Sequence, residues 1–230
     1  MILLYLLVIE VKGMSNIWKL TKLDFYIIKP YMKSIYLRML IPIIFAAINR
    51  SLIAGISFAM FFVPTTITLY TFSIIEKNSM ERLYSILPIQ KSEEVIGRYT
   101  SSIIIGLISL IFSLISQSII LMILGEFVSV FEFILSTFIG IILFIFYLSF
   151  QLPGYYKFGF IKGKIFMYIP LVGFLITFFL IIKVSTNIIN LFSVIDNSPT
   201  LFMSSFIIFT IITLIISVLI SIKILKNKEI

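Results

Sequence analysis

Residues 99–125 read "YTSSIIIGLISLIFSLISQSIILMILG", a stretch without a single charged side chain. A helix needs about 20 mostly apolar residues to cross the hydrocarbon core of a membrane. This run is therefore long enough for one crossing and too short for two. Similar uncharged runs occupy residues 51–75, 133–156, 165–182 and 197–222. The pattern predicts an all-α integral membrane protein.

A sixth and shorter apolar run lies between Arg38 and Arg50. A helix over residues 31–49 can cross the membrane if Lys33 and Arg38 extend toward the headgroups. We expect Pro42 to kink this helix and a tight turn at Arg50 to lead into the next span. The chain is thus predicted to have six transmembrane helices, with both termini on one side.

The composition agrees with this class and excludes several kinds of chemistry. Of the 230 residues, 60% are hydrophobic and 12% are charged, whereas about 25% of a soluble domain is charged. Cysteine and histidine are both absent from the sequence, which excludes disulfides, thiol nucleophiles and histidine-based metal or acid–base sites. The net charge of +8 fits basic cytoplasmic loops better than a nucleic-acid partner.

The distribution of charge predicts the orientation. If both termini are cytoplasmic, every Lys and Arg except Arg50 and Lys183 lies on the inner side, and the outer loop at 125–132 carries only Glu126 and Glu132. The positive-inside rule then predicts that both termini are cytoplasmic. We expect Lys183 to reach the outer headgroups, with contact to an anionic substrate as the alternative.

The N-terminal part divides into two predicted segments. Residues 1–13 are expected to form a peripheral extension, because their apolar run is too short to span a membrane. Residues 14–230 are expected to form one six-span domain.

A basic amphipathic helix is predicted just ahead of the first span and should end at Pro30. One face carries Lys19, Lys22, Tyr26, Lys29 and Lys33. The other carries Trp18, Phe25 and Ile28, widened by Leu20, Leu23 and Ile27. Such a helix should lie flat in the inner membrane interface. A simple basic anchor beside the membrane is the alternative.

Residues 76–98, between the second and third spans, read "EKNSMERLYSILPIQKSEEVIGR". Asn78 and Glu81 have the spacing of a capping box, which predicts a short helix over residues 79–86, ended by Pro88. Its apolar face consists of Met80, Leu83, Tyr84 and Leu87. The residues alone leave two alternatives open: this helix docks on a soluble partner, or it rests on the bilayer.

A second helix is predicted to start at Ser92 and to continue into the third span, with Glu93 and Glu94 in its first turn. These two glutamates and Arg98 spell E-E-x-x-x-R, a pattern found in membrane-embedded proteases. In those enzymes the glutamates act with histidines, and this chain has none. The glutamates also lie at the water boundary, where burial does not raise their pKa much. The protease hypothesis is therefore disfavoured.

The segment from residue 76 to 102 resembles the cytoplasmic loop of bacterial type 2 ABC transporter permeases of the small six-span kind. The matching positions are Glu76, Leu87–Pro88, Gln90–Lys91, Glu94 and Arg98–Tyr99, although Gln90 replaces a residue that is often basic. A second stretch, "QLPGYYKFGFIKGKIF" at residues 151–166, resembles the second cytoplasmic loop of this family. Its matching positions are Pro153, Tyr155, Tyr156, Gly159, Lys162 and Lys164.

The resemblance implies a non-catalytic permease subunit of an ATP-driven exporter for a hydrophobic or amphipathic substrate, such as an antimicrobial or toxin peptide or a drug. It implies a separate cytoplasmic ATPase and a second permease chain as partners. The chain lacks the G-x-x-x-x-G-K-[ST] loop that holds phosphates, so ATP and Mg are expected on the ATPase. The predicted coupling residues are Glu76, Glu81, Arg82, Leu83, Tyr84, Leu87, Pro88, Lys91, Glu94 and Arg98. The alternative function is a stand-alone immunity or scaffold protein without transport activity.

Within the third span, small and polar residues follow one another at three- and four-residue steps. They are Ser102, Gly106, Ser109, Ser113 and Ser116, with Gln117 beside the last. Small residues let membrane helices approach closely, which favours a packing seam within the subunit. A substrate path and a dimer contact are the alternatives.

Overall fold

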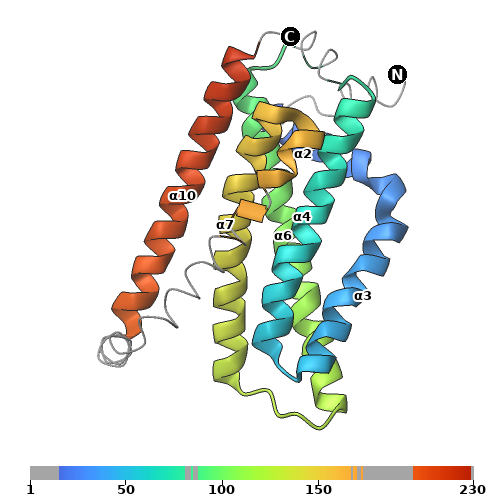
Figure 1. Ribbon diagram of the computed structural model, residues 1–230, viewed down its shortest axis with the longest axis vertical. Coiled ribbons are helices and arrows are strands. Elements are labelled where there is room, and N and C mark those ends of the chain that lie inside the picture. Colours follow the sequence, from blue (N-terminus) through green and yellow to red (C-terminus); the bar gives the residue numbers. More distant parts are fainter. Residues whose placement is uncertain are drawn as a thin grey trace.

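In the computed structural model, all the secondary-structure elements of the described residues are helical (Figure 1). The description covers residues 16–80, 84, 88–166, 168–169, 172 and 199–228. The elements are α2 (Asn16–Ile28), the 3-10 helix η1 (Lys29–Tyr31), α3 (Met32–Asn49), α4 (Leu52–Lys77), α6 (Lys91–Ile123), α7 (Val130–Gly163) and α10 (Pro199–Asn227).

Among these residues, five stretches are long and apolar enough to cross a membrane. The first runs from Asn16 to Asn49 through α2, η1 and α3, and the others lie in α4, α6, α7 and α10. The predicted all-helical membrane fold is thus confirmed, whereas the number of six spans is not. The expected span at 165–182 and Lys183 lie mostly or wholly outside the described residues.

The helices form an elongated bundle in which α4 packs against α3, α6 and α7, and α10 packs against α7 and α6 (Figure 1). The largest group of buried apolar side chains joins α4, α6, α7 and α10. Leu52, Ile56 and Leu152 within it are completely buried. The start of α2 and the end of α10 lie at one end of the bundle, and the α3–α4 turn lies at the other. This arrangement brings both ends of the described chain to the same side.

The turn between α3 and α4 forms where the sequence predicts it. Arg50 adopts a left-handed backbone (φ 49°), and the Ser51 hydroxyl accepts a hydrogen bond from the amide of Ala54 as an N-cap. The Arg50 guanidinium lies 3.2 Å from the Glu126 carboxylate, which comes from the connection between α6 and α7. This ion pair closes the end of the bundle farthest from α2.

Helix α6 begins slightly earlier than expected. Its N-cap is Gln90 rather than Ser92, and Ser92 lies within the first helical turn. The Gln90 amide donates to the Glu93 carboxylate over 2.9 Å, the back-bond of a capping box. As predicted, Glu93 and Glu94 occupy the first turn, and the helix continues without interruption to Ile123.

Helix α7 extends into the segment that the sequence predicted as a loop. Residues up to Gly163 are helical, but Gly159 has φ 73° and ψ −176°, and this non-helical residue kinks the helix. The left-handed φ favours glycine at this position. Tyr155 and Tyr156, just before the kink, are buried side chains of the helix.

Candidate functional site around a buried arginine

The first turns of α6 carry a guanidinium that is almost fully removed from solvent. Arg98 is only 4% exposed, and its Cζ atom lies 5.1 Å from the centre of the Phe72 ring and 5.8 Å from that of Tyr84. A buried charge is costly unless it is paired. The surrounding residues must therefore supply a partner.

That partner is Asp24 of α2. Its Oδ2 atom lies 3.4 Å from the Nε atom of Arg98, and the Asp24 side chain is 3% exposed. The Ser101 hydroxyl donates a hydrogen bond to the same oxygen over 2.7 Å. The ion pair joins α2, the first described helix, to α6, which begins 67 residues after Asp24.

Two further contacts extend this junction along both helices. The Asn16 amide donates to both Glu93 carboxylate oxygens, at 3.2 and 3.1 Å, and the Thr21 hydroxyl donates to the Gly97 carbonyl over 3.1 Å. The partners stay 76 or 77 residues apart from Asn16 to Asp24. A constant offset means that α2 and the first turns of α6 run side by side in the same direction.

Gly97 makes this close approach possible. A Cβ atom at this position would lie 2.9 Å from the Leu20 Cβ and 3.2 Å from the Ile17 carbonyl oxygen. Any larger residue would therefore push α2 away from α6 and lengthen the polar contacts on either side.

The predicted amphipathic helix ahead of the first span corresponds to α2, which packs along α6. Its position in the inner membrane interface stays a prediction. Its buried residues are Leu20, Thr21, Asp24 and Ile28. The basic side chains Lys29 and Lys33 are exposed, as the amphipathic pattern requires.

The connection between α4 and α6 (the 78–90 loop) is described at residues 78–80, 84 and 88–90, and its Tyr84 packs onto the same region. Tyr84 is 5% exposed and forms an apolar cluster with Leu20 of α2 and Ile75 of α4. Burial raises the pKa of Tyr84 to about 12, although the nearby Arg98 opposes this shift. Tyr84, α2 and the end of α4 thus share one small core.

The end of α4 is joined to α7 at the kink. The Glu76 carboxylate accepts a hydrogen bond from the amide of Phe160, the residue after Gly159. A Cβ atom on Gly159 would lie 3.0 Å from the nearer carboxylate oxygen. Glycine therefore provides both the backbone conformation and the space for this contact.

The C-terminal helix contacts α6 over the same turns. The Tyr99 hydroxyl lies 2.5 Å from the Ser217 hydroxyl and 3.0 Å from that of Ser221. The Lys91 ammonium donates to the Lys228 carbonyl over 3.3 Å. Among the described residues, α2 and α10 are thus connected to the first turns of α6, and α7 is connected to the end of α4.

The predicted coupling residues fall into four groups. Tyr84 and Arg98 are buried, so they can affect a soluble partner only through their neighbours, whereas Glu76 and Pro88 are exposed. Lys91 and Glu94 are half-buried, and Glu94 lines a small cavity with Arg98 and Tyr156. The remaining residues, Glu81, Arg82, Leu83 and Leu87, lie outside the described part of the chain, as does most of the predicted helix at 79–86.

Asn78, the expected first residue of that capping box, is the C-cap of α4, and its side-chain amide donates to the Ile74 carbonyl over 2.8 Å. Its predicted partner Glu81 lies outside the described residues, so the capping box stays a prediction.

The small-residue stripe of α6 faces the inside of the bundle. A Cβ atom on Gly106 would lie 2.3 Å from the Phe144 ring of α7, and one on Gly55 of α4 would lie 2.3 Å from the Gln117 Oε1 atom. Ser102, Ser109, Ser113 and Gln117 are buried, and Ser116 is half-buried. The hydroxyls of Ser102 and Ser109 donate to carbonyls of their own helix.

Asp24 and Ser101 are residues of the site that the sequence analysis did not identify. A usable signal was present, because Asp24 is the only acidic residue between residues 14 and 75, and it lies among lysines. It also shares the helical face of Leu20, Thr21 and Ile28 rather than the basic face. An acid on the packing face of a helix requires a buried partner.

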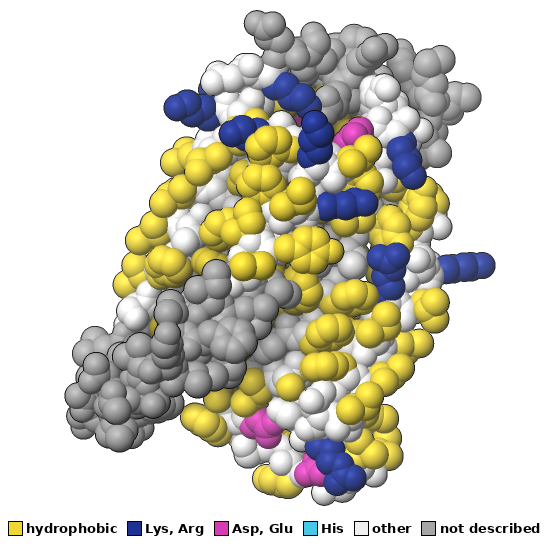
Figure 2. Space-filling view, viewed as in Figure 1, with side chains coloured by type: hydrophobic (Ala, Val, Ile, Leu, Met, Phe, Trp, Pro, Cys, Tyr) yellow, Lys and Arg dark blue, Asp and Glu magenta, His cyan; other side chains and the backbone are white. Residues whose placement is uncertain are grey.

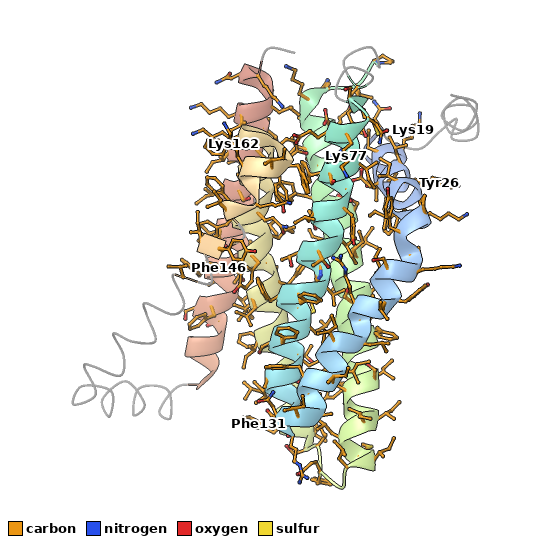
Figure 3. All side chains as sticks on the ribbon, turned by 45° about the vertical axis from the view of Figure 1, so that its right-hand side comes forward. Lys19, Tyr26, Lys77, Phe131, Phe146 and Lys162 are labelled. Carbon is orange, nitrogen blue, oxygen red and sulfur yellow. The ribbon has the colours of Figure 1, made fainter. Side chains whose placement is uncertain are left out.

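The described charged residues are segregated along the bundle. Basic side chains gather toward the α2 end and along the α3 side, whereas the opposite end shows a small mixed group of charges (Figure 2). Lys19, Lys77 and Lys162 all lie toward the first end, and Phe131 lies at the other (Figure 3).

In the part of the chain that the structure describes, no group of three or more Asp, Glu, Cys or His residues could hold a metal ion. Glu93 accepts hydrogen bonds from Asn16 and from the Gln90 amide, so it helps to hold α2 against the start of α6. The buried Asp24–Arg98 pair joins α2 to α6, and the rings of Phe72 in α4 and of Tyr84 lie against the same guanidinium. The Arg98 side chain is thus a meeting point of α2, α4, α6 and Tyr84.

These features define a multi-pass α-helical membrane protein with a mechanically connected, basic end. A family model described as "ABC-2 family transporter protein" matches residues 19–226. The chain therefore belongs to the ABC-2 family of transporter membrane proteins, as its resemblance to type 2 ABC permeases predicted. This family forms the membrane component of transporters, is generally non-catalytic and usually works with an ATPase. No curated protein and no solved structure matches the chain.

Proposed function

We propose that this chain is the permease subunit of an ATP-driven exporter and that a separate cytoplasmic ABC ATPase docks on the end of the bundle around residues 76–91. Two permease chains and two ATPases would form the transporter. This chain binds neither ATP nor Mg, which belong to the ATPase.

The observation that carries this proposal is the buried Asp24–Arg98 pair beneath the 78–90 loop. A partner that pushes the loop also pushes Tyr84, whose ring lies 5.8 Å from the Arg98 Cζ atom. Arg98 is part of the rigid helix α6, so the movement reaches the membrane span directly. Packed side chains with one well-defined arrangement transmit such displacements because they are not compressible.

The distribution of charge supports a cytoplasmic position for this end. Lys77, Lys91 and Lys162 belong to it, and basic residues favour the cytoplasmic side of bacterial membrane proteins. The opposite end contains Arg50 paired with Glu126. These observations support our proposal that the chain lies in the bacterial cytoplasmic membrane with both termini inside the cell.

The proposed cargo is a hydrophobic or amphipathic molecule such as an antimicrobial peptide, a toxin peptide or a drug, and export of a toxic peptide would also give self-immunity. The predominantly apolar bundle supports this class, because the described spans carry no ionisable pair near their middle that would favour a small charged solute.

Copurification tests the proposal. The tagged full-length chain, extracted in a mild detergent, should retain a protein with a G-x-x-x-x-G-K-[ST] loop, and ATP hydrolysis by that protein should change when the two are reconstituted in vesicles. A stand-alone immunity or scaffold protein would retain no ATPase and would protect cells without ATP-dependent export.

A further inference from the structure

A groove opens on the side of the bundle where α2, η1 and α3 meet α4 and α6. Its volume is about 480 Å³, within the range of roughly 300–1,000 Å³ that is usual for small-ligand sites. The groove therefore has room for one small amphiphile rather than for a helix of another protein.

Most of the groove is apolar. Ile35 and Met39 of α3 face Ile105, Ile108 and Phe112 of α6 across it. The lining on α6 extends over two turns, or roughly 10 Å at 1.5 Å per residue. Such a surface suits a hydrocarbon chain lying along the helices.

One end of the groove is basic. Lys22 of α2 and Lys29 of η1 belong to its lining, and Lys29 is exposed. Figure 3 shows Tyr26 on α2, close to where α3 starts, and its ring also lines the groove. The lining is almost wholly apolar, so the two lysines contribute mainly their hydrocarbon stems to it, and no acidic residue is among the described lining residues.

We propose that this groove holds one acyl chain of an anionic phospholipid between α3 and α6, with the phosphate outside its rim near Lys22 and Lys29. The distribution of charge supports this occupant, because both lysines belong to the end of the bundle where basic side chains gather and the apolar lining continues from there along α3 and α6. Lipid binding requires no ATPase, so it can be tested whether or not the transport proposal holds.

The test uses the full chain reconstituted in phosphatidylcholine vesicles with a photoactivatable phosphatidylglycerol whose diazirine is on the acyl chain. After illumination, labelled peptides are mapped by mass spectrometry. Label should concentrate on α3 and α6 residues of the groove, and unlabelled phosphatidylglycerol should compete about tenfold better than phosphatidylcholine, as two lysines near a phosphate predict.

Two variants distinguish the groove from the general lipid boundary. Met39→Trp should fill it and remove the concentrated label, whereas Ile115→Trp, on an exposed α6 position outside the groove, should leave the label unchanged. The double variant K22Q/K29Q keeps the apolar lining, so it should bind lipid but lose the preference for phosphatidylglycerol. The control K223Q/K226Q, at exposed lysines of α10, should keep that preference.

Three results would overturn the proposal. Label spread evenly over the exposed apolar faces and insensitive to Met39→Trp would indicate general lipid contact only. A preference for phosphatidylglycerol that survives K22Q/K29Q would remove the assigned phosphate site. Stronger labelling after deletion of residues 1–13 would indicate that this segment occupies the groove, and a cross-link between two chains in the groove would indicate that a second copy does.

Discussion

The Nε atom of Arg98 lies 3.4 Å from the Oδ2 atom of Asp24, and their side chains are only 4% and 3% exposed. This contact joins α2 to α6, together with the hydrogen bonds of Asn16 and Thr21 to the first turns of α6. Because both charges are buried, each depends on the other for its solvation, and neither can be removed alone without cost.

Replacing one member of this pair should therefore be strongly destabilising. We expect Asp24→Leu or Arg98→Met alone to lower the free energy of unfolding by about 3–5 kcal/mol, because the remaining charge stays buried without a partner. The double variant D24L/R98M should recover much of this loss. Thermal unfolding of the detergent-solubilised chain measures the effect.

The exposed pair at the other end of the bundle is the matched control. The Arg50 side chain is 66% exposed, so Arg50→Gln should cost at most about 1 kcal/mol. Equal losses for the two pairs, or a double variant no more stable than the single ones, would contradict the role assigned to the buried pair.

The kink in α7 should depend on glycine. Gly159→Ala forces a side chain into a left-handed backbone and also crowds the Glu76 carboxylate, so we expect a loss of about 1–3 kcal/mol. Gly125→Ala has a similar φ of 81° with nothing within 4 Å of the added carbon, so it should cost less. The unfolding midpoint of Gly159→Ala reports backbone strain together with crowding of Glu76, whereas that of Gly125→Ala reports backbone strain alone. Equal midpoints would show that the Glu76 contact contributes nothing.

The small-residue stripe should behave as a packing seam. Gly106→Ala places a methyl group against the Phe144 ring, and overpacking of this kind typically costs about 1–3 kcal/mol. Phe144→Leu in the same chain should restore part of the stability. If Gly106→Ala instead left stability unchanged and altered substrate export alone, the stripe would line a substrate path.

The buried phenol of Tyr84 predicts a loss of stability in strong alkali. Its pKa is raised to about 12 in the folded chain, against about 10 when unfolded, so the neutral form is favoured by folding. The neutral phenol contributes its full share to the free energy of unfolding below pH 10. This share is lost as the pH rises toward 12, which lowers the free energy of unfolding by roughly 2–3 kcal/mol. Tyr84→Phe should lack this component, and unfolding at pH 9 and 11.5 for both chains measures the difference. The same dependence in both would assign it to other groups.

Much of the fold could be predicted from the gaps between charges. The start of α4, the turn at Arg50 and the uninterrupted course of α6 all follow from local patterns of charge, capping and hydropathy. The burial of Arg98 could not be predicted in this way. From its position near the water boundary it was expected to face a partner, because its actual neighbours, Asp24 and Phe72, are distant in sequence.

The same reason explains why the sequence did not predict the packing of α2 on α6 or the role of its acid, Asp24. The lysine face of α2 is visible as a periodic pattern, but the sequence does not say whether the opposite face meets lipid or protein. Asp24 indicates a protein contact on this face only once its partner on α6 is known.

The role of Gly159 could be predicted only in part. Its match to the second cytoplasmic loop of the family is visible in the sequence, whereas its contact with Glu76 is not.

The central claim is that an ATPase docks around residues 76–91, and site-specific cross-linking tests it most directly. Because the chain has no cysteine, single cysteines at Lys77, Pro88 and Phe127 can each carry a photoactivatable group without background labelling. The first two are exposed beside the loop, and Phe127 is 91% exposed at the opposite end. We predict ATPase adducts from Lys77→Cys and Pro88→Cys and none from Phe127→Cys. Adducts from Phe127→Cys alone, or from none of the three in a chain that still exports its substrate, would contradict the account.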